Sequence, residues 1–159
     1  MALLEGLDDF DWTAVPGPKW YRPSDVPSAL RALASNPEGR GDVTSQALFA
    51  FGNNHAGTYY PVVLPALPFL RQILEHGDRS ARMATMAVLE ELTYFEPEFE
   101  FTTVVGPDGA GVALANLFER SVLGLRDALT TITSSASDEA ELQLARGLLT
   151  RLTELESER

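Results

Sequence analysis

Apolar residues recur at spacings of three and four along most of this chain, and this period constrains its fold more than any other feature. Ala81, Ala84, Val88, Leu92 and Phe95 show it clearly, because that spacing places five side chains on one face of an α-helix. The stretch 98–105 is the exception, since it begins with residues that alternate as in a β-strand. The sequence therefore predicts an all-α fold.

Turn residues and helix-capping side chains divide the periodic part of the chain into six predicted helices. Asp42 and Asp78 are suited to N-cap positions, whereas Gly77 and Pro97 follow the ends of apolar runs. The polar run that begins at Thr133 ends the fifth helix, which we expect to be unbroken. The six predicted helices cover residues 25–35, 42–51, 59–75, 78–95, 114–132 and 138–155.

The third predicted helix is unusual because it contains Pro61, Pro65 and Pro68. One proline can occupy the first helical position without cost. Each of the others would remove a backbone donor and clash with the preceding turn. We therefore expect a bent helix, or a short turn that restarts as a helix at Pro68.

Two segments fall outside the helical period. Residues 1–23 contain Trp12, Trp20 and Tyr21, which a free tail would not need, so we expect an ordered N-terminal arm that packs over the end of the first helices. Residues 96–111 combine the alternating stretch with glycine-rich turn chemistry. They predict a long loop that can include a short extended hairpin.

Three successive helical hairpins suit a short stacked α-solenoid, with a plain helix bundle as the alternative. The stretch 54–74 and the following helix at 81–92 resemble a HEAT-type repeat of small bacterial proteins, including its proline-bent first helix. The resemblance covers residues 42–95 and extends to the first and last hairpins by pattern. It implies a single HEAT-like domain over residues 1–159.

The charge balance and the absence of cysteine exclude several classes of function. With 23 Asp and Glu against 12 Lys and Arg, the formal net charge of −11 repels nucleic acid and anionic membranes. A chain without cysteine has no disulfide, thiolate nucleophile or thiolate metal site. The first ten residues carry no Lys or Arg, and no apolar run approaches about 18 residues. We expect a soluble cytoplasmic protein.

No catalytic, metal-binding or cofactor-binding motif stands out. His55 and His76 do not have a metal-ligand spacing, no nucleophile elbow or phosphate loop is present, and no pair among the 23 carboxylates is distinguished. We expect no enzymatic activity, no metal and no cofactor. A nucleic-acid glycosylase of the HEAT-like type is disfavoured, since such enzymes present a basic cradle and this chain has Lys19 as its single lysine.

Charge placement is the most informative signal for function. Seven acidic residues and no Lys or Arg lie between Arg82 and Arg120, and aromatic residues are interleaved with them. The interval is either a solvated face or a surface that recognises a basic partner. Similarly, Glu90 either lines a concave surface or is an ordinary surface charge, and His55 either ties two helix ends together or binds a partner. The predicted recognition residues are Glu90, Glu91, Tyr94, Glu96, Glu98, Phe99 and Glu100, helped by Asn53, Asn54 and His55.

Two functions are compatible with these features. Proteins that resemble this one are often encoded beside polymorphic toxins, where some act as immunity proteins, so the resemblance implies a module that binds and neutralises a basic toxin. The alternative is a scaffold without inhibitory activity. In either case, we expect that the glutamates at 96, 98 and 100 do not hold the fold.

Overall fold

The computed structural model describes residues 3–35 and 40–158 and confirms the all-α prediction. Three short 3-10 helices accompany the α-helices, at Leu7–Asp9, Trp12–Ala14 and Phe99–Phe101. Within the described residues the α-helices are α1 (Asp25–Ser35), α2 (Arg40–Phe51), α3 (Val63–His76), α4 (Arg79–Thr93), α5 (Leu114–Leu123), α6 (Arg126–Ser135) and α7 (Glu139–Ser157). The strands are β1 (Gly52–Asn53), β2 (Thr58–Tyr59), β3 (Glu96–Pro97), β4 (Thr103–Val105) and β5 (Gly111–Ala113).

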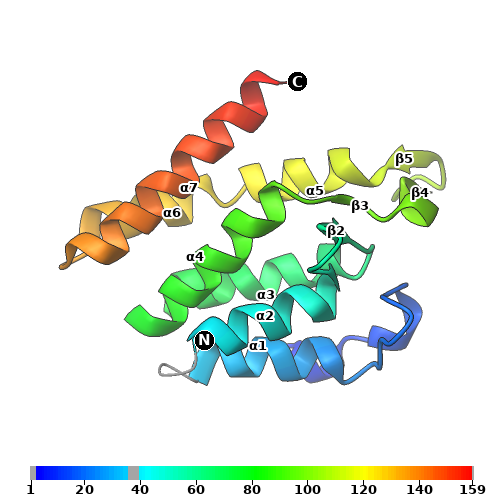
Figure 1. The fold of residues 1–159 in the computed structure, drawn as a ribbon, viewed down its shortest axis with the longest axis horizontal. Coiled ribbons are helices and arrows are strands. Elements are labelled where there is room, and N and C mark those ends of the chain that lie inside the picture. Colours follow the sequence, from blue (N-terminus) through cyan, green and yellow to red (C-terminus); the bar gives the residue numbers. More distant parts are fainter. Residues whose placement is uncertain (1–2, 36–39, 159) are drawn as a thin grey trace.

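Helix α4 lies at the centre of the fold and contacts α1, α2, α3 and α7 (Figure 1). Consecutive helices also pair, α1 with α2, α3 with α4 and α6 with α7, as the predicted hairpins require. The inward stripe of α4 includes Leu89 and Leu92, both fully buried. The buried side chains form one cluster that extends from Leu7 in the arm to Leu155 in α7.

The fifth predicted helix is wrong in one respect, because it is two helices that meet at Gly124. The Gly124 N–H bonds to the Arg120 carbonyl, and the next N–H, of Leu125, reaches back only to the Val122 carbonyl. The Gly124 carbonyl accepts a 3.0 Å bond from Arg71 Nη1 of α3 and thus leaves the helical ladder. Glycine is a weak helix former, so this position is where a break costs least.

Helix α3 runs without interruption through Pro68, so the predicted restart there does not occur. Pro65 lies in the first turn, where a backbone N–H would have no partner within the helix. Pro61 precedes the helix in a turn that the Val63 N–H closes on the Tyr60 carbonyl. Only Pro68 therefore removes a helical hydrogen bond, and its own side chain is exposed.

A three-stranded sheet, in the order β1-β2-β3, is a feature that the helical period did not predict. The strand β2 pairs antiparallel with β1 and parallel with β3. In the predicted loop, β4 and β5 form an antiparallel hairpin whose turn includes Gly109 at φ +83°. The alternating stretch before it is a 3-10 helix at Phe99–Phe101 rather than a strand.

The N-terminal arm is ordered, and Trp12 is its buried anchor. The Trp12 indole packs against Phe69 of α3 with ring centroids 6.0 Å apart and donates a 3.2 Å hydrogen bond to the Leu7 carbonyl. The Tyr21 hydroxyl donates to the Trp12 carbonyl at 3.0 Å. Trp20, in contrast, is about half exposed and donates to the Phe49 carbonyl of α2. No described helix is long and apolar enough to cross a membrane.

Candidate protein-binding surface

The three-stranded sheet brings two distant parts of the predicted surface together. Asn53 of β1 and Glu96 of β3 each pair with Thr58 of β2. Backbone bonds hold β3 in place, since the Glu96 N–H donates to the Gly57 carbonyl at 3.0 Å and the Glu98 N–H donates to the Tyr59 carbonyl at 2.8 Å. The loop after α2 and the segment after α4 therefore lie side by side.

A groove of about 400 Å³ lies between α2, α4 and α7. We call it the acidic groove, because Glu90 and Glu91 are the charged residues among its described lining residues. Of the two alternatives for Glu90, the structure shows the one in which it lines a concave surface. The lining residues are Thr44, Ser45, Leu48, Asn54, Ala87, Glu90, Glu91, Tyr94 and Leu144, of which Asn54, Glu90, Glu91 and Tyr94 were predicted.

Tyr94 forms the end of this groove and is 61% exposed. The guanidinium carbon of Arg151, from α7, lies 4.1 Å from the centroid of the Tyr94 ring, a cation–π contact. Arg151 is itself held by a 2.8 Å hydrogen bond that its Nη2 donates to the Thr93 carbonyl. The orientation of the Tyr94 ring is therefore fixed from one side by Arg151.

The segment from Glu96 to Glu100 continues beyond the groove. Glu96 and Glu100 are exposed, and Phe99, at 87% exposure, is the most exposed of the large apolar side chains that the structure describes. None of the pocket-like cavities described for the chain includes Phe99 or Glu100. These side chains project from the surface instead of lining a concave site.

Glu98 corrects the expectation that no glutamate of this segment holds the fold. Its carboxylate accepts a 2.8 Å hydrogen bond from the Thr58 hydroxyl, and its side chain is partly buried. Such a bond contributes about 1 kcal/mol to stability. Glu98 therefore ties β2 to the segment that follows β3, whereas the carboxylates of Glu96 and Glu100 have no hydrogen bond or ion pair within the described residues.

Asn53 and His55 are mainly structural. The Asn53 carboxamide oxygen accepts hydrogen bonds from the backbone N–H groups of His55 and Ala56, which closes the turn after α2. The His55 ring is exposed and contacts the Phe49 ring edge-on, with centroids 5.0 Å apart. These contacts hold His55 against α2 and within its own turn, and none of them reaches a second helix.

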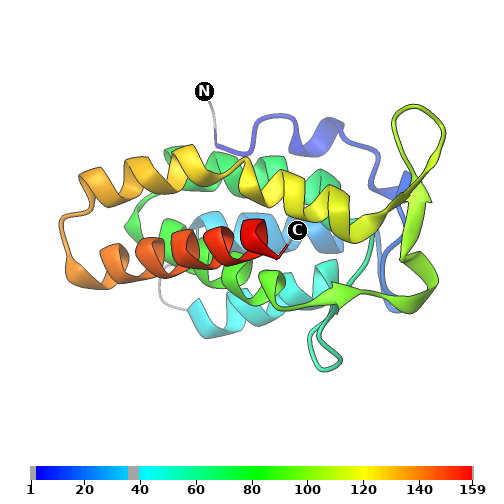
Figure 2. The same ribbon diagram turned by 90° about the horizontal axis from the view of Figure 1, so that it is seen from above.

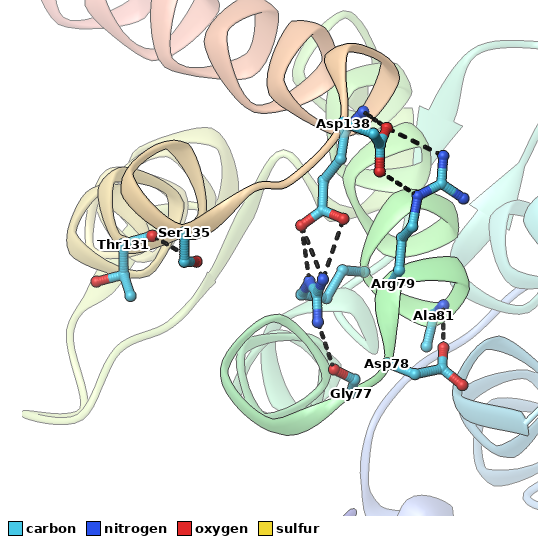
Figure 3. A network of polar contacts seen from close by, with 9 residues as sticks. Gly77, Asp78, Arg79, Ala81, Thr131, Ser135 and Asp138 are labelled. Atoms are coloured by element: carbon cyan, nitrogen blue, oxygen red, sulfur yellow. Dashed lines mark hydrogen bonds and ion pairs between the residues drawn. The ribbon is translucent and has the colours of Figure 1, made fainter.

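A second polar cluster, which the sequence did not single out, connects α4 to α7 (Figure 3). Arg82 donates two 3.0 Å hydrogen bonds to the carboxylate of Glu141, a residue that is only 2% exposed. The same guanidinium donates to the Gly77 carbonyl at 2.9 Å. Arg82 and Glu141 are 59 positions apart in the chain, so no local spacing could have identified the pair.

The outer half of this cluster is the ion pair of Arg79 and Asp138. The hydrogen bond from the Arg79 guanidinium, and next the backbone N–H of Glu141, lower the pKa of Asp138 to about 2. Asp138 thus stays ionised and caps α7. Every charge in this cluster is paired, which indicates a structural role rather than a chemical one.

The described residues contain no group of His, Asp or Glu side chains that could hold a metal ion. Burial, and next the carboxylates of Glu119 and Glu96, raise the pKa of Tyr59, a buried residue whose ring packs on Phe118 at 4.5 Å. No family model, curated protein or solved structure matches the chain.

Proposed function

We propose that this protein is a binding module for a basic protein partner and that the acidic groove, with the segment Glu96–Glu100, is its docking surface. The observation that carries this proposal is the lining of the groove. Glu90, Glu91, Asn54 and Tyr94 meet there from two separate parts of the chain, and no Lys or Arg is among the described lining residues. A concave surface of one charge sign attracts and orients a partner of the other sign.

Two exposed aromatic side chains supply apolar contact area, which charged side chains alone do not provide. Tyr94 and Phe99 are 61% and 87% exposed, and each is flanked by glutamates along the chain. Aromatic anchors that become buried on binding carry much of the energy of protein interfaces, whereas charges at the rim chiefly raise the association rate. The surface therefore combines steering with contact area.

Neutralisation of a toxin is the specific form of this function that we propose. It follows from the HEAT-like resemblance of residues 42–95, because proteins of that appearance include immunity proteins. A toxin that acts on nucleic acid carries a basic cleft, so an acidic inhibitor would gain both rate and selectivity from opposite charge. The formal net charge of −11 supports this pairing.

The test is co-expression of the chain with each protein encoded beside its gene, with growth of the host as the readout. We expect the chain to restore growth against a basic partner. Glu90→Lys combined with Glu91→Lys should abolish this protection. Glu5→Lys combined with Asp9→Lys, at two exposed positions of the arm outside the groove, is the matched control and should leave protection intact. Equal loss of protection in both variants would contradict the proposed site.

A further inference from the structure

The β4–β5 hairpin leaves one edge of β4 without a strand partner in the described residues. Two backbone hydrogen bonds establish the register of the hairpin. The Leu114 N–H donates to the Thr102 carbonyl at 3.0 Å, and the Gly106 N–H donates to the Ala110 carbonyl at 2.7 Å. Because hydrogen-bonded pairs alternate along an antiparallel ladder, Val104 is the residue of β4 that bonds to β5.

Thr103 and Val105 consequently direct their backbone N–H and C=O groups away from β5. Neither residue has a backbone or side-chain hydrogen bond on that side within the described part of the chain. Val105 also exposes 78% of its side chain. An unpaired strand edge of this kind is a template for another extended chain.

A groove of about 520 Å³ lies against β4, and we call it the β4 groove. Its other walls are the arm at residues 14–16, the start of α3 at Leu64 and Pro65, and the side chains of Phe101 and Leu117. All three residues of β4 line it and none of β5 does. A groove that touches every residue of β4 and none of β5 is what a cavity beside the free edge of β4 would show.

The walls of the β4 groove are apolar, but two carboxylates lie near one end. No Asp, Glu, Lys or Arg is among its described lining residues. Phe101 contacts the Tyr60 ring at a centroid distance of 5.5 Å. Glu100 directly precedes Phe101 in the chain and so lies next to this end of the groove. Burial, and next the negative charges of Glu98 and Glu100, raise the pKa of Tyr60.

We infer that the β4 groove is a second docking site, which accepts an extended apolar segment of a partner protein as an added strand on β4. The free N–H and C=O groups of Thr103 and Val105 would pair with its backbone, and the groove would take every second side chain. A Lys or Arg of that segment would face Glu98 and Glu100.

This inference goes beyond the proposed function, because the β4 groove and the acidic groove share no lining residue, although Glu98 and Glu100 of the proposed docking surface also lie toward the β4 groove. In Figure 2 the β4–β5 hairpin and the adjoining part of the arm lie at one end of the molecule, whereas α2 runs along one of its long sides. The negative charge of the protein also determines which kind of occupant the β4 groove favours. A second copy would bring another −11 charge and another pair of Glu98 and Glu100 carboxylates to the same edge, whereas a basic segment is attracted.

The probe is a synthetic peptide, acetyl-Lys-Val-Thr-Val-Thr-Val-amide, titrated into the full-length chain and followed by amide NMR shifts and calorimetry. We expect saturable binding with the largest shifts at Thr103 and Val105. Methylating one alternate set of peptide amides should weaken binding about tenfold, and methylating the other set should not, because only one set faces β4. Replacing the peptide Lys by Glu should also weaken binding.

Two protein variants complete the test. Leu117→Lys, in the wall of the groove, should abolish binding of the peptide while the helical circular dichroism spectrum stays unchanged. Glu90→Lys with Glu91→Lys should bind the peptide as the wild type does, which separates this site from the acidic groove. The inference would be overturned if the peptide did not bind, or if neither set of methylated amides weakened its binding. It would also be overturned if the NMR shifts were confined to other elements, or if the chain dimerised through β4.

Discussion

The hydroxyl of Thr58 donates a 2.8 Å hydrogen bond to the carboxylate of Glu98, 40 positions along the chain. This bond links the loop after α2 to the segment after α4, next to the parallel pairing of β2 and β3. One carboxylate thus serves two purposes. It adds negative charge to the proposed docking surface and holds that surface in register with Asn53 and its neighbours.

Charge reversal should therefore lower the free energy of unfolding more at Glu98 than at the nearby Glu96. Glu98→Lys is expected to lower the free energy of unfolding by about 1 kcal/mol, because the Thr58 hydroxyl loses its acceptor. The exposed Glu96→Lys is expected to change it by less than about 0.5 kcal/mol. Urea denaturation of the two variants is the measurement. Equal effects would show that the Thr58 bond contributes nothing to stability.

Removing one member of the buried pair of Arg82 and Glu141 should be costly. Arg82→Met leaves the carboxylate of Glu141, 2% exposed, without its partner, and we expect a loss of about 3 kcal/mol in the free energy of unfolding. The double variant with Glu141→Leu should recover most of that loss, because no buried charge remains. A double variant as unstable as Arg82→Met alone would contradict this explanation.

The capping carboxylate Asp138 makes a pH-dependent contribution whose sign follows from its pKa. A pKa lowered from its usual 3.8 to about 2 means that the ionised form is favoured in the folded state. The contribution is present above about pH 4 and is lost as the pH falls through about 2. Asp138→Asn keeps a capping side chain, so its stability deficit relative to wild type should shrink between pH 4 and pH 2 in thermal melts. A deficit independent of pH would refute this.

Two Gly→Ala substitutions should have opposite signs. A Cβ at Gly52 would lie 2.0 Å from the backbone carbonyl oxygen of Thr58, so Gly52→Ala must displace β1 from β2 and should cost more than about 2 kcal/mol. At Gly147 in α7 a Cβ meets nothing within 4 Å, and Gly147→Ala should stabilise by about 0.5–1 kcal/mol. Thermal denaturation of both variants is the check, and the Gly52 prediction fails if both are stabilising.

The proposed docking surface predicts different kinetic effects for charge and for the aromatic anchor. Glu96→Lys with Glu100→Lys, which leaves the structural Glu98 intact, should slow association with the basic partner about tenfold at low salt. Phe99→Ala should mainly speed dissociation. Surface plasmon resonance over a salt series measures both. Leu3→Ala, another exposed apolar truncation, is the control and should change neither rate.

An association rate that the double charge reversal leaves unchanged at low salt would contradict steering by this surface. In that case the acidic interval between Arg82 and Arg120 would serve solubility alone.

The sequence was sufficient to predict those elements that depend on residues close together in the chain. The stripe that contains Val88 and Leu92 predicted α4, and the Asp78 side chain caps that helix by accepting a 2.8 Å bond from the Ala81 N–H. Trp12 predicted an ordered arm because so large an apolar side chain needs burial. The glycine-rich turn indicated that the loop at 96–111 can include a hairpin, and the hairpin spans residues 103–113, two residues beyond that loop.

The candidate surface could be predicted only as a set of residues, because charge and aromatic content are properties of composition. That Asn54 and Tyr94 share one groove depends on how α2 packs on α4. That Glu98 supports the fold depends on Thr58, which no helical or strand period connects to it.

The sequence by itself therefore determined the helical class, most helix positions and the sign of the surface charge, since these depend on spacings of a few residues and on residue counts. Tertiary structure alone decided the break at Gly124, the pairing of β2 with β3, the burial of Glu141 against Arg82 and the free edge of β4. Each of these depends on partners more than about 12 residues apart in the chain or on a hairpin's register, and such contacts form only when the packed helices bring the groups together.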